Sequence, residues 1–210
     1  KKEYERWLAN ATADADVAAE LKTLDDAKIE DAFYRDLDFG TGGLRGVIGA
    51  GTNRMNIYTV AKASQGLADY LKKNFAEPSV AIGYDSRIKS DVFAKVAAGV
   101  FAANGVKVSI WPVLMPVPTV SFATRYLHTS AGVMVTASHN PSKYNGYKVY
   151  WEDGAQLPPR HADQVAKKMK ELDVFDCVKT MDYDKAVAEG KIVLMGAETD
   201  EKFLANVMEQ

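Results

Sequence analysis

Residues 131–151 have the sequence AGVMVTASHNPSKYNGYKVYW, which contains two candidate strands and the loop between them. The first, residues 131–138, opens with an apolar run that predicts a buried strand. The second, residues 146–151, alternates as a strand does, and no helix separates the two. We therefore predict that residues 146–151 pair antiparallel at an edge of the sheet. The loop holds a serine beside a histidine, an asparagine and a proline.

Outside this stretch, short apolar segments alternate with longer segments of helical periodicity. The predicted strands are residues 43–49, 79–85, 106–112 and 191–196, and the predicted helices are residues 55–75, 90–105, 117–127, 158–172 and 182–190. Strands that alternate with helices imply βαβ units, right-handed crossovers and a largely parallel sheet. The expected fold class is α/β, a three-layer α/β/α arrangement around a mostly parallel, mixed sheet.

The two ends of the chain differ from this pattern. Residues 3–37 carry apolar side chains at helical spacing, so we expect a helical extension over residues 1–38. The main domain is expected to cover residues 39–197. Residues 199–210 are expected to begin a helix capped by Thr199, and we assign residues 198–210 to the start of, or the linker to, a second domain.

The composition is ordinary for a globular chain and narrows the function only by exclusion. Among the 210 residues, 47% are hydrophobic and 26% are charged, and the formal net charge is −2. With so small a net charge, the protein has no overall electrostatic field that would favour nucleic acid or an anionic membrane. No apolar run approaches the roughly 18 residues that cross a bilayer. The single cysteine, Cys177, excludes an intrachain disulfide and suits a reducing compartment. We expect a cytoplasmic protein with neither nucleic acid nor membrane as a partner.

Three loops are expected at the carboxyl-end rim of the sheet, where α/β proteins bind ligands. The first is FGTGGLRG, residues 39–46, whose glycines allow a ligand to approach the backbone closely. It is no Rossmann fingerprint, because Arg45 occupies the third glycine position, and no P-loop, because no Lys-Ser/Thr pair follows. Two interpretations stay open: a glycine turn with a solvated Arg45, or an arginine fork aimed at phosphate.

The second loop is GYDSR, residues 83–87. We expect Asp85 and Ser86 to cap the helix that follows, because both side chains accept hydrogen bonds from free backbone N–H groups. Arg87 would then reach an anion at the positive end of that helix. Capping without any ligand is the alternative.

The third loop contains Ser138, just past a predicted buried strand, so its hydroxyl is expected to point into a cleft. One interpretation is an ST-turn or helix cap closed by Pro141. A Ser-His-Asp hydrolase is disfavoured, because immediate neighbours in sequence rarely meet its geometry and no G-x-S-x-G elbow is present. The donors His139, Asn140 and Lys148 suit a serine that carries phosphate, with its charge of roughly −1.5 to −2. Lys148 would be a base if it is partly desolvated beside cations.

Four motifs together resemble the α-D-phosphohexomutase superfamily, in the phosphoglucomutase/phosphomannomutase branch that also contains phosphopentomutases. They are TASHNP at residues 136–141, FGTGGLRG, GYDSR, and NGYKVYWEDGAQL at residues 145–157. The likeness runs over about residues 39–160. It implies the first of four domains of an isomerase that transfers phosphate between two positions of a hexose phosphate through a bisphosphate.

The resemblance also implies roles for individual residues. Ser138 would carry the phosphate, hand it to a sugar monophosphate and take back the other phosphate of the resulting bisphosphate. His139 and Arg45 would steady the phosphoryl group, and Lys148 would be the general acid/base. The supporting cleft residues would be Asn140, Arg87 and Thr41.

Members of the superfamily use Mg²⁺, and glucose 1,6-bisphosphate is their intermediate or activator. Ser138 would bind the metal through its phosphate, but the aspartate-rich DxDxD loop of the second domain has no counterpart in these 210 residues. The expected partners are a sugar phosphate and domains II–IV of the same polypeptide, and this chain alone should do little catalysis. The alternatives are a phosphopentomutase or a glucose-1,6-bisphosphate synthase and, outside enzymes, an anion-binding α/β module.

Overall fold

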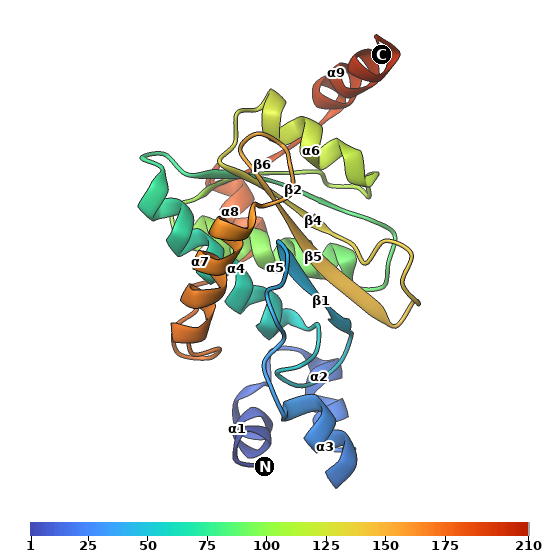
Figure 1. The fold of residues 1–210 in the computed structure, drawn as a ribbon, viewed down its shortest axis with the longest axis vertical. Helices are drawn as coiled ribbons and strands as arrows, with labels where there is room; N and C mark the ends of the chain where they lie inside the picture. The colour runs from blue at the N-terminus through green and yellow to red at the C-terminus, as the bar shows by residue number, and fades with distance from the viewer. Residues whose placement is uncertain (210) are drawn as a thin grey trace.

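The computed structural model describes residues 1–209 as a twisted sheet covered by helices on both faces, with three small helices at one end (Figure 1). The strands are β1 (Gly43–Val47), β2 (Ser79–Tyr84), β3 (Lys107–Ile110), β4 (Ala131–Val135), β5 (Tyr144–Trp151) and β6 (Ile192–Leu194). The helices are α1 (Lys2–Asn10), α2 (Ala15–Leu21), α3 (Asp26–Phe33), α4 (Ile57–Asn74), α5 (Ser90–Ala103), α6 (Val117–Tyr126), α7 (Pro159–Glu171), α8 (Tyr183–Ala188) and α9 (Ala197–Met208). The predicted α/β fold class is confirmed.

The strand order is β1-β5-β4-β2-β3-β6. The pairs β4–β2, β2–β3 and β3–β6 are parallel, whereas β1–β5 and β5–β4 are antiparallel, so the sheet is mixed. The prediction that residues 146–151 form an edge strand is wrong. β5 lies inside the sheet because β1, which carries Arg45, pairs along its outer side and becomes the edge.

Two apolar layers hold the helices against the sheet. On one face, α4, α5 and α7 enclose a core that includes Ile82, Val133 and Tyr147. On the other face, α6 packs Val120 against a smaller cluster around Met134. All five residues of β4 are buried, as expected of a strand that is covered on both sides.

Helices are present in the predicted extension, but there are three of them, and the last ends at Phe33 and does not reach residue 37. The breaks have a local cause, because Asp14 and Asp25 accept hydrogen bonds from backbone N–H groups and so start α2 and α3. Trp7 fixes the extension to the main domain through edge-to-face contact with Tyr58, at 5.3 Å between ring centroids.

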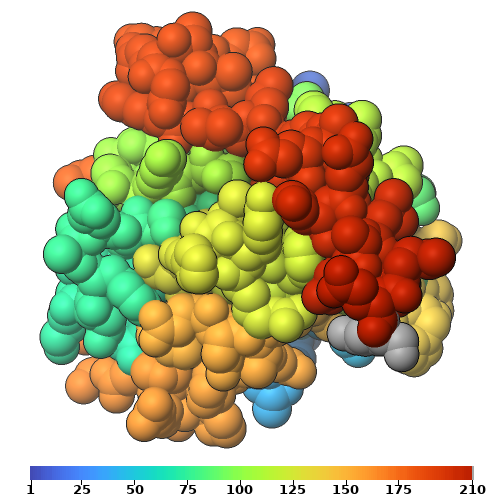
Figure 2. Space-filling view, turned by 90° about the horizontal axis from the view of Figure 1, so that it is seen from above, coloured from blue at the N-terminus to red at the C-terminus, as the bar shows by residue number. Residues whose placement is uncertain are grey.

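The C-terminal helix α9 begins after Gly196, so the prediction of a Thr199 cap is wrong. Thr199 lies within the first turn and is buried, and its N–H bonds to the Gly196 carbonyl. Figure 2 shows α9 lying across the outer surface, and its Phe203 contacts Phe122 of α6 at 5.5 Å between ring centroids. Gln210 lies outside the described residues, and the boundary at residues 197–198 stays a prediction. No helix among residues 1–209 combines the length and apolar character that a membrane crossing requires.

Candidate active site

The loop from Thr136 to Tyr144, here called the serine loop, joins the carboxyl end of β4 to the start of β5. Ser138 and His139 are at its tip, and the Ser138 hydroxyl lies 3.2 Å from His139 Nδ1. Ser138 has φ 54°, in the left-handed region that residues with a Cβ seldom occupy. Such strain persists only where the surroundings hold it, and it is concentrated at functional sites.

Arg87 binds the backbone of the serine loop. Its guanidinium donates to the carbonyl oxygens of Ser138 and Asn140, the second at 2.7 Å. It also donates to the carbonyls of Pro141 and Tyr144, both at 3.2 Å. In this structure the guanidinium donors of Arg87 bind backbone carbonyls of the loop. The role of Arg87 in phosphate binding stays a prediction.

Asp85 is the second residue that shapes the loop. One carboxylate oxygen accepts from the Thr136 hydroxyl at 2.6 Å, and that hydroxyl oxygen in turn accepts from Ser138 N–H at 2.9 Å. The other oxygen accepts from the Ser90 hydroxyl at 2.8 Å and from Arg87 N–H at 3.0 Å. The Ser138 backbone is therefore tied to the segment that follows β2 as well as to its own loop.

The prediction that Asp85 and Ser86 cap the following helix is wrong. α5 begins at Ser90, and the residue before it, Lys89, has a left-handed backbone and makes no side-chain cap. The Asp85 carboxylate is already occupied by the hydroxyls of Thr136 and Ser90. Four residues lie between Asp85 and the first residue of the helix.

Arg45 and Lys148 lie on one face of the sheet. Tyr147 is buried on the α4 face, where its hydroxyl meets Ser64 at 3.0 Å, and it pairs with Leu44 of β1. Because successive side chains of a strand point to opposite faces, Lys148 and Arg45 both point to the α6 face. Arg45 is exposed and Lys148 is half-buried. Burial strongly raises the pKa of the Tyr147 hydroxyl, so this tyrosine stays neutral.

The register places Arg45 beside the serine loop. It lies opposite Gly146, whose carbonyl accepts from Thr136 N–H at 3.1 Å. Lys148 lies opposite Met134 on β4 and two residues further along β5 than Gly146. At about 3.3 Å per residue, these two cations are diagonal neighbours on the β1–β5 pair, of which β5 leads out of the loop.

Thr41 lies elsewhere, and the prediction that residues 39–42 share the rim with Ser138 is wrong. β1 and β4 are both antiparallel to β5, so the loop before β1 lies at the amino-end side of the sheet. The carbonyl of the adjacent Gly42 accepts from Val149 N–H, far along β5 from the serine loop. The role of Thr41 in phosphate binding stays a prediction.

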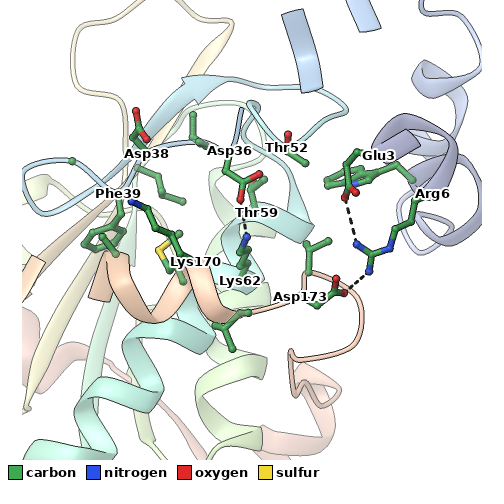
Figure 3. A pocket seen from close by; sticks show the side chains of 18 residues that line it. Glu3, Arg6, Asp36, Asp38, Phe39, Thr52, Thr59, Lys62, Lys170 and Asp173 are labelled. Atoms are coloured by element: carbon green, nitrogen blue, oxygen red, sulfur yellow. Dashed lines mark hydrogen bonds and ion pairs between the residues drawn. The ribbon is translucent and has the colours of Figure 1, made fainter. Parts of the chain in front are cut away.

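A cavity of about 620 Å³ opens away from the serine loop, between the N-terminal helices, the segment before β1, α4 and α7 (Figure 3). None of the predicted site residues lines it. Its charged groups largely neutralise each other: Arg6 pairs with Glu3 and Asp173, and Lys62 pairs with Asp36 at 2.9 Å. The cavity therefore offers no excess positive charge that would select a sugar phosphate.

The described part of the chain supplies little for a metal ion. Across residues 1–209, no three His, Cys, Asp or Glu side chains gather into a potential metal site. Asp85 is the acidic residue bonded into the serine loop, and its oxygens are occupied by Thr136, Ser90 and Arg87. These residues do not form a magnesium cage on their own.

Comparison with known proteins gives the same interpretation as the motifs. Residues 36–174 match the family described as phosphoglucomutase/phosphomannomutase, alpha/beta/alpha domain I. The chain belongs to the phosphoglucomutase/phosphomannomutase family. The match includes the serine loop, Arg45, Arg87 and Lys148, so the site residues lie within the domain that defines the family.

Individual members of the family are similar over most of this chain. A phosphoglucomutase of Staphylococcus haemolyticus is 46% identical over 143 residues, 68% of this chain and 26% of its own length. A Schizosaccharomyces pombe protein named "Probable phosphoribomutase" is 46% identical over 154 residues, 72% of this chain and 26% of its own. A Thermus thermophilus protein crystallised as a candidate phosphomannomutase has a TM-score of 0.61 at 30% identity, and the match covers 74% of this chain and 35% of that protein.

The chain therefore spans about a quarter of the curated relatives that it matches, at 26% of each. Those named phosphoglucomutase are isomerases. The comparisons therefore establish the fold and the family of this domain. They do not establish the activity of the complete enzyme.

Sequence reasoning misses the polar side chains that shape the serine loop. It predicts a helix cap for Asp85 and no role for Thr136 or Asn145. Asn145 is fully buried and donates to the Ile88 carbonyl at 3.1 Å and to Ser90 at 3.0 Å. The available signal is the asparagine itself, because a side-chain amide at a buried position of a strand needs hydrogen-bond partners.

Proposed function

We propose that this domain carries the phosphoserine of a phosphoglucomutase/phosphomannomutase, with Ser138 as the phosphate carrier. One observation carries the proposal: Ser138 stands at the tip of the loop while its backbone is held in a strained, left-handed conformation by Arg87 and Thr136. A hydroxyl that served only a turn would need no such support. The anion-binding module without turnover, the non-enzymatic alternative, does not account for it.

The proposed reaction has two balanced transfers. A sugar-phosphate hydroxyl attacks the phosphorus of phospho-Ser138, so that a sugar O–P bond forms, the serine O–P bond breaks, and the attacking hydroxyl loses its proton. The resulting bisphosphate then presents its other phosphate and the Ser138 oxygen attacks that phosphorus. A serine O–P bond forms, the sugar O–P bond breaks, and the sugar oxygen takes up a proton, so that the phosphoserine is regenerated. No phosphate is gained or lost overall, which makes the enzyme an isomerase and a hexose 1,6-bisphosphate its intermediate.

Residues of this chain would supply positioning and charge. Lys148, half-buried on the α6 face, is proposed to take and return the proton of the attacking hydroxyl. Arg45 on the same face and His139, 3.2 Å from Ser138, are proposed to balance the charge on the phosphoryl oxygens. Asn140 is proposed as a further donor at the tip of the loop.

Magnesium belongs to the same proposal, with most of its ligands outside this chain. When bound it would neutralise charge on the transferred phosphate. Within this chain the phosphate on Ser138 is the proposed ligand, and the acidic ligands would come from another domain. The cytoplasmic location and the need for further domains of the same polypeptide are likewise parts of the proposal.

Intact-mass measurement tests the proposal on the complete enzyme. After incubation with glucose 1,6-bisphosphate and Mg²⁺, we expect the mass of one phosphate to be added. Ser138→Ala should remove both the added mass and turnover. Ser142→Ala, which alters another serine of the same loop, should leave both in place. Turnover that survives in Ser138→Ala would rule out the phosphoserine role.

A second candidate is a phosphopentomutase, favoured by the 46% identity to the Schizosaccharomyces pombe "Probable phosphoribomutase". The chemistry at Ser138 would be the same, and only the sugar would differ. Comparing kcat/KM for glucose 1-phosphate, mannose 1-phosphate and ribose 1-phosphate in the complete enzyme separates the two. A preference for ribose 1-phosphate would select this second candidate.

A further inference from the structure

Residues 85–89 connect two parts of the molecule that are far apart in the sequence. In the middle of the segment, Arg87 donates to four carbonyls of the serine loop. At its end, the Lys89 ammonium lies 2.8 Å from Asp16 Oδ2 and 3.9 Å from Asp14 Oδ2 of the N-terminal extension. The extension and the serine loop are therefore joined through a few residues.

The segment is held rigidly between these contacts. Lys89 has φ 63°, a conformation that residues with a Cβ avoid unless their surroundings fix it. Asn145 donates to the carbonyl of Ile88, the residue between Arg87 and Lys89, at 3.1 Å. The pKa of Asp16 is lowered by its hydrogen bond to Lys89 and by the charge of that lysine.

Three of the four charged side chains in this arrangement are more buried than those of ordinary surface ion pairs. The Arg87 side chain is 14% exposed, Lys89 is 24% exposed and Asp14 is 13% exposed, whereas Asp16, which makes the shorter contact to Lys89, is 79% exposed. The Arg87 terminal nitrogens each serve two carbonyls, and Nε faces Asp85 at 3.7 Å. A guanidinium used in this way has no free fork for a phosphate.

We propose that residues 85–89 are a brace through which the N-terminal helices position Ser138, and that Arg87 is a positioning residue and not a phosphate ligand. The functional meaning rests on the proposed phosphoserine role of Ser138. The geometric claim stands apart from that role, because it concerns the order of the serine loop whether or not a phosphate is present.

Hydrogen exchange of the chain tests the geometric claim. The N–H groups of Ser138, Asn140 and Tyr144 bond within the serine loop and report on its opening. We expect Arg87→Lys, which keeps the charge but loses the fork, to speed their exchange about tenfold. Lys89→Met should speed the same amides several-fold, and Lys89→Arg should restore protection.

Lys191→Met is the matched control, because Lys191 forms an ion pair of similar length, 3.1 Å, with Glu189 next to β6, the strand at the opposite edge of the sheet from β1. It should leave the serine loop unchanged. The brace is refuted if Lys89→Met leaves serine-loop exchange at the wild-type rate, or if β2 and β4 amides speed up as much as the loop. The first result would show that the N-terminal contact does not support the serine loop, and the second that it supports only global stability.

Kinetics of the complete enzyme give the functional readout. A positioning role predicts that Arg87→Lys lowers kcat while KM for the sugar phosphate stays within about twofold, because the lost contact is to the loop and not to the substrate. A rise in KM with unchanged kcat would identify Arg87 as a phosphate ligand and overturn the proposal. Turnover retained in Ser138→Ala would refute the phosphoserine while leaving the exchange result intact.

Discussion

Lys148 lies directly opposite Gly43 in the antiparallel ladder between β1 and β5. A Cβ at Gly43 would fall 1.9 Å from the carbonyl oxygen of Tyr147 and 3.1 Å from the Cα of Lys148. No side chain fits there unless β1 moves away from β5. Because β1 also carries Arg45, the spacing between the two proposed catalytic cations depends on the absence of a side chain at Gly43.

Gly43→Ala should therefore destabilise the domain and reduce activity. We expect a loss of about 2 kcal/mol or more, since overpacking against backbone cannot relax by a rotamer change. Urea unfolding measures the loss. Gly40→Ala is the control, because nothing lies within 4 Å of the Cβ it would add, and it should be close to neutral. Wild-type stability in Gly43→Ala would show that the β1–β5 contact is looser than described.

Lys148→Met tests the proposed general acid/base. The substitution keeps a similar stem and removes the ammonium, so kcat of the complete enzyme should fall by about 10²-fold or more while the melting temperature changes little. Lys107→Met, at an exposed strand position of the same sheet, should change neither. If kcat survives while the melting temperature drops, Lys148 is structural.

The ion pair between Arg6 and Asp173 should give the domain a pH-dependent part of its stability. The two atoms Nη2 and Oδ1 lie 2.5 Å apart, and the hydrogen bond from Arg6 lowers the pKa of Asp173 to about 2. A lowered carboxyl pKa stabilises the fold above the unfolded-state value near 4, and this contribution is lost as the pH falls towards about 2.

Arg6→Met should therefore cost about 1 kcal/mol at pH 7, a value reduced for side chains that are about one-third exposed. The difference from wild type, measured by urea unfolding, should shrink below pH about 4. Lys1→Met removes a contact of 3.9 Å to Asp26 between far more exposed side chains and should have no effect. A difference that is constant down to pH about 2 would contradict the assignment.

His161 predicts a second pH dependence, at mildly acidic pH. Its ring stacks on Trp151 at 4.2 Å between centroids, and its Nδ1 lies 2.5 Å from the Tyr70 hydroxyl. Burial, assisted by the charge of Arg160, lowers the pKa of the imidazole. The folded state thus favours the neutral ring, so stability is complete above pH about 6.5 and falls as the pH drops below that value.

His161→Phe keeps an aromatic ring in the stack without a titrating group. Urea unfolding between pH about 8 and 5 should therefore show a flatter stability curve for the variant than for wild type. An equal decline in both proteins would assign the titration to another group.

Much of this architecture follows from local sequence alone. Apolar runs such as residues 79–85 and 131–138 predict strands, and helical spacing predicts α4 to α7, because side-chain periodicity is set by the backbone geometry of each element. The serine loop was likewise identifiable as a candidate site, because a polar loop after a buried strand of an α/β sheet lies where ligands bind.

Other features depend on residues that are distant in the sequence. Nothing local to β1 shows that it takes the edge position, since strand order is set by which strands pair across the whole chain. The helix cap predicted for Asp85 is wrong for the same reason, and the loop carbonyls that Arg87 binds could not be predicted. Their partners come from a distant segment, as the separations of 51 residues between Asp85 and Thr136 and between Arg87 and Ser138 show. The sequence determined which elements form and which hydroxyl stands at the rim, and the tertiary structure decided which groups hold that hydroxyl in place, because a hydrogen bond is chosen by proximity in space.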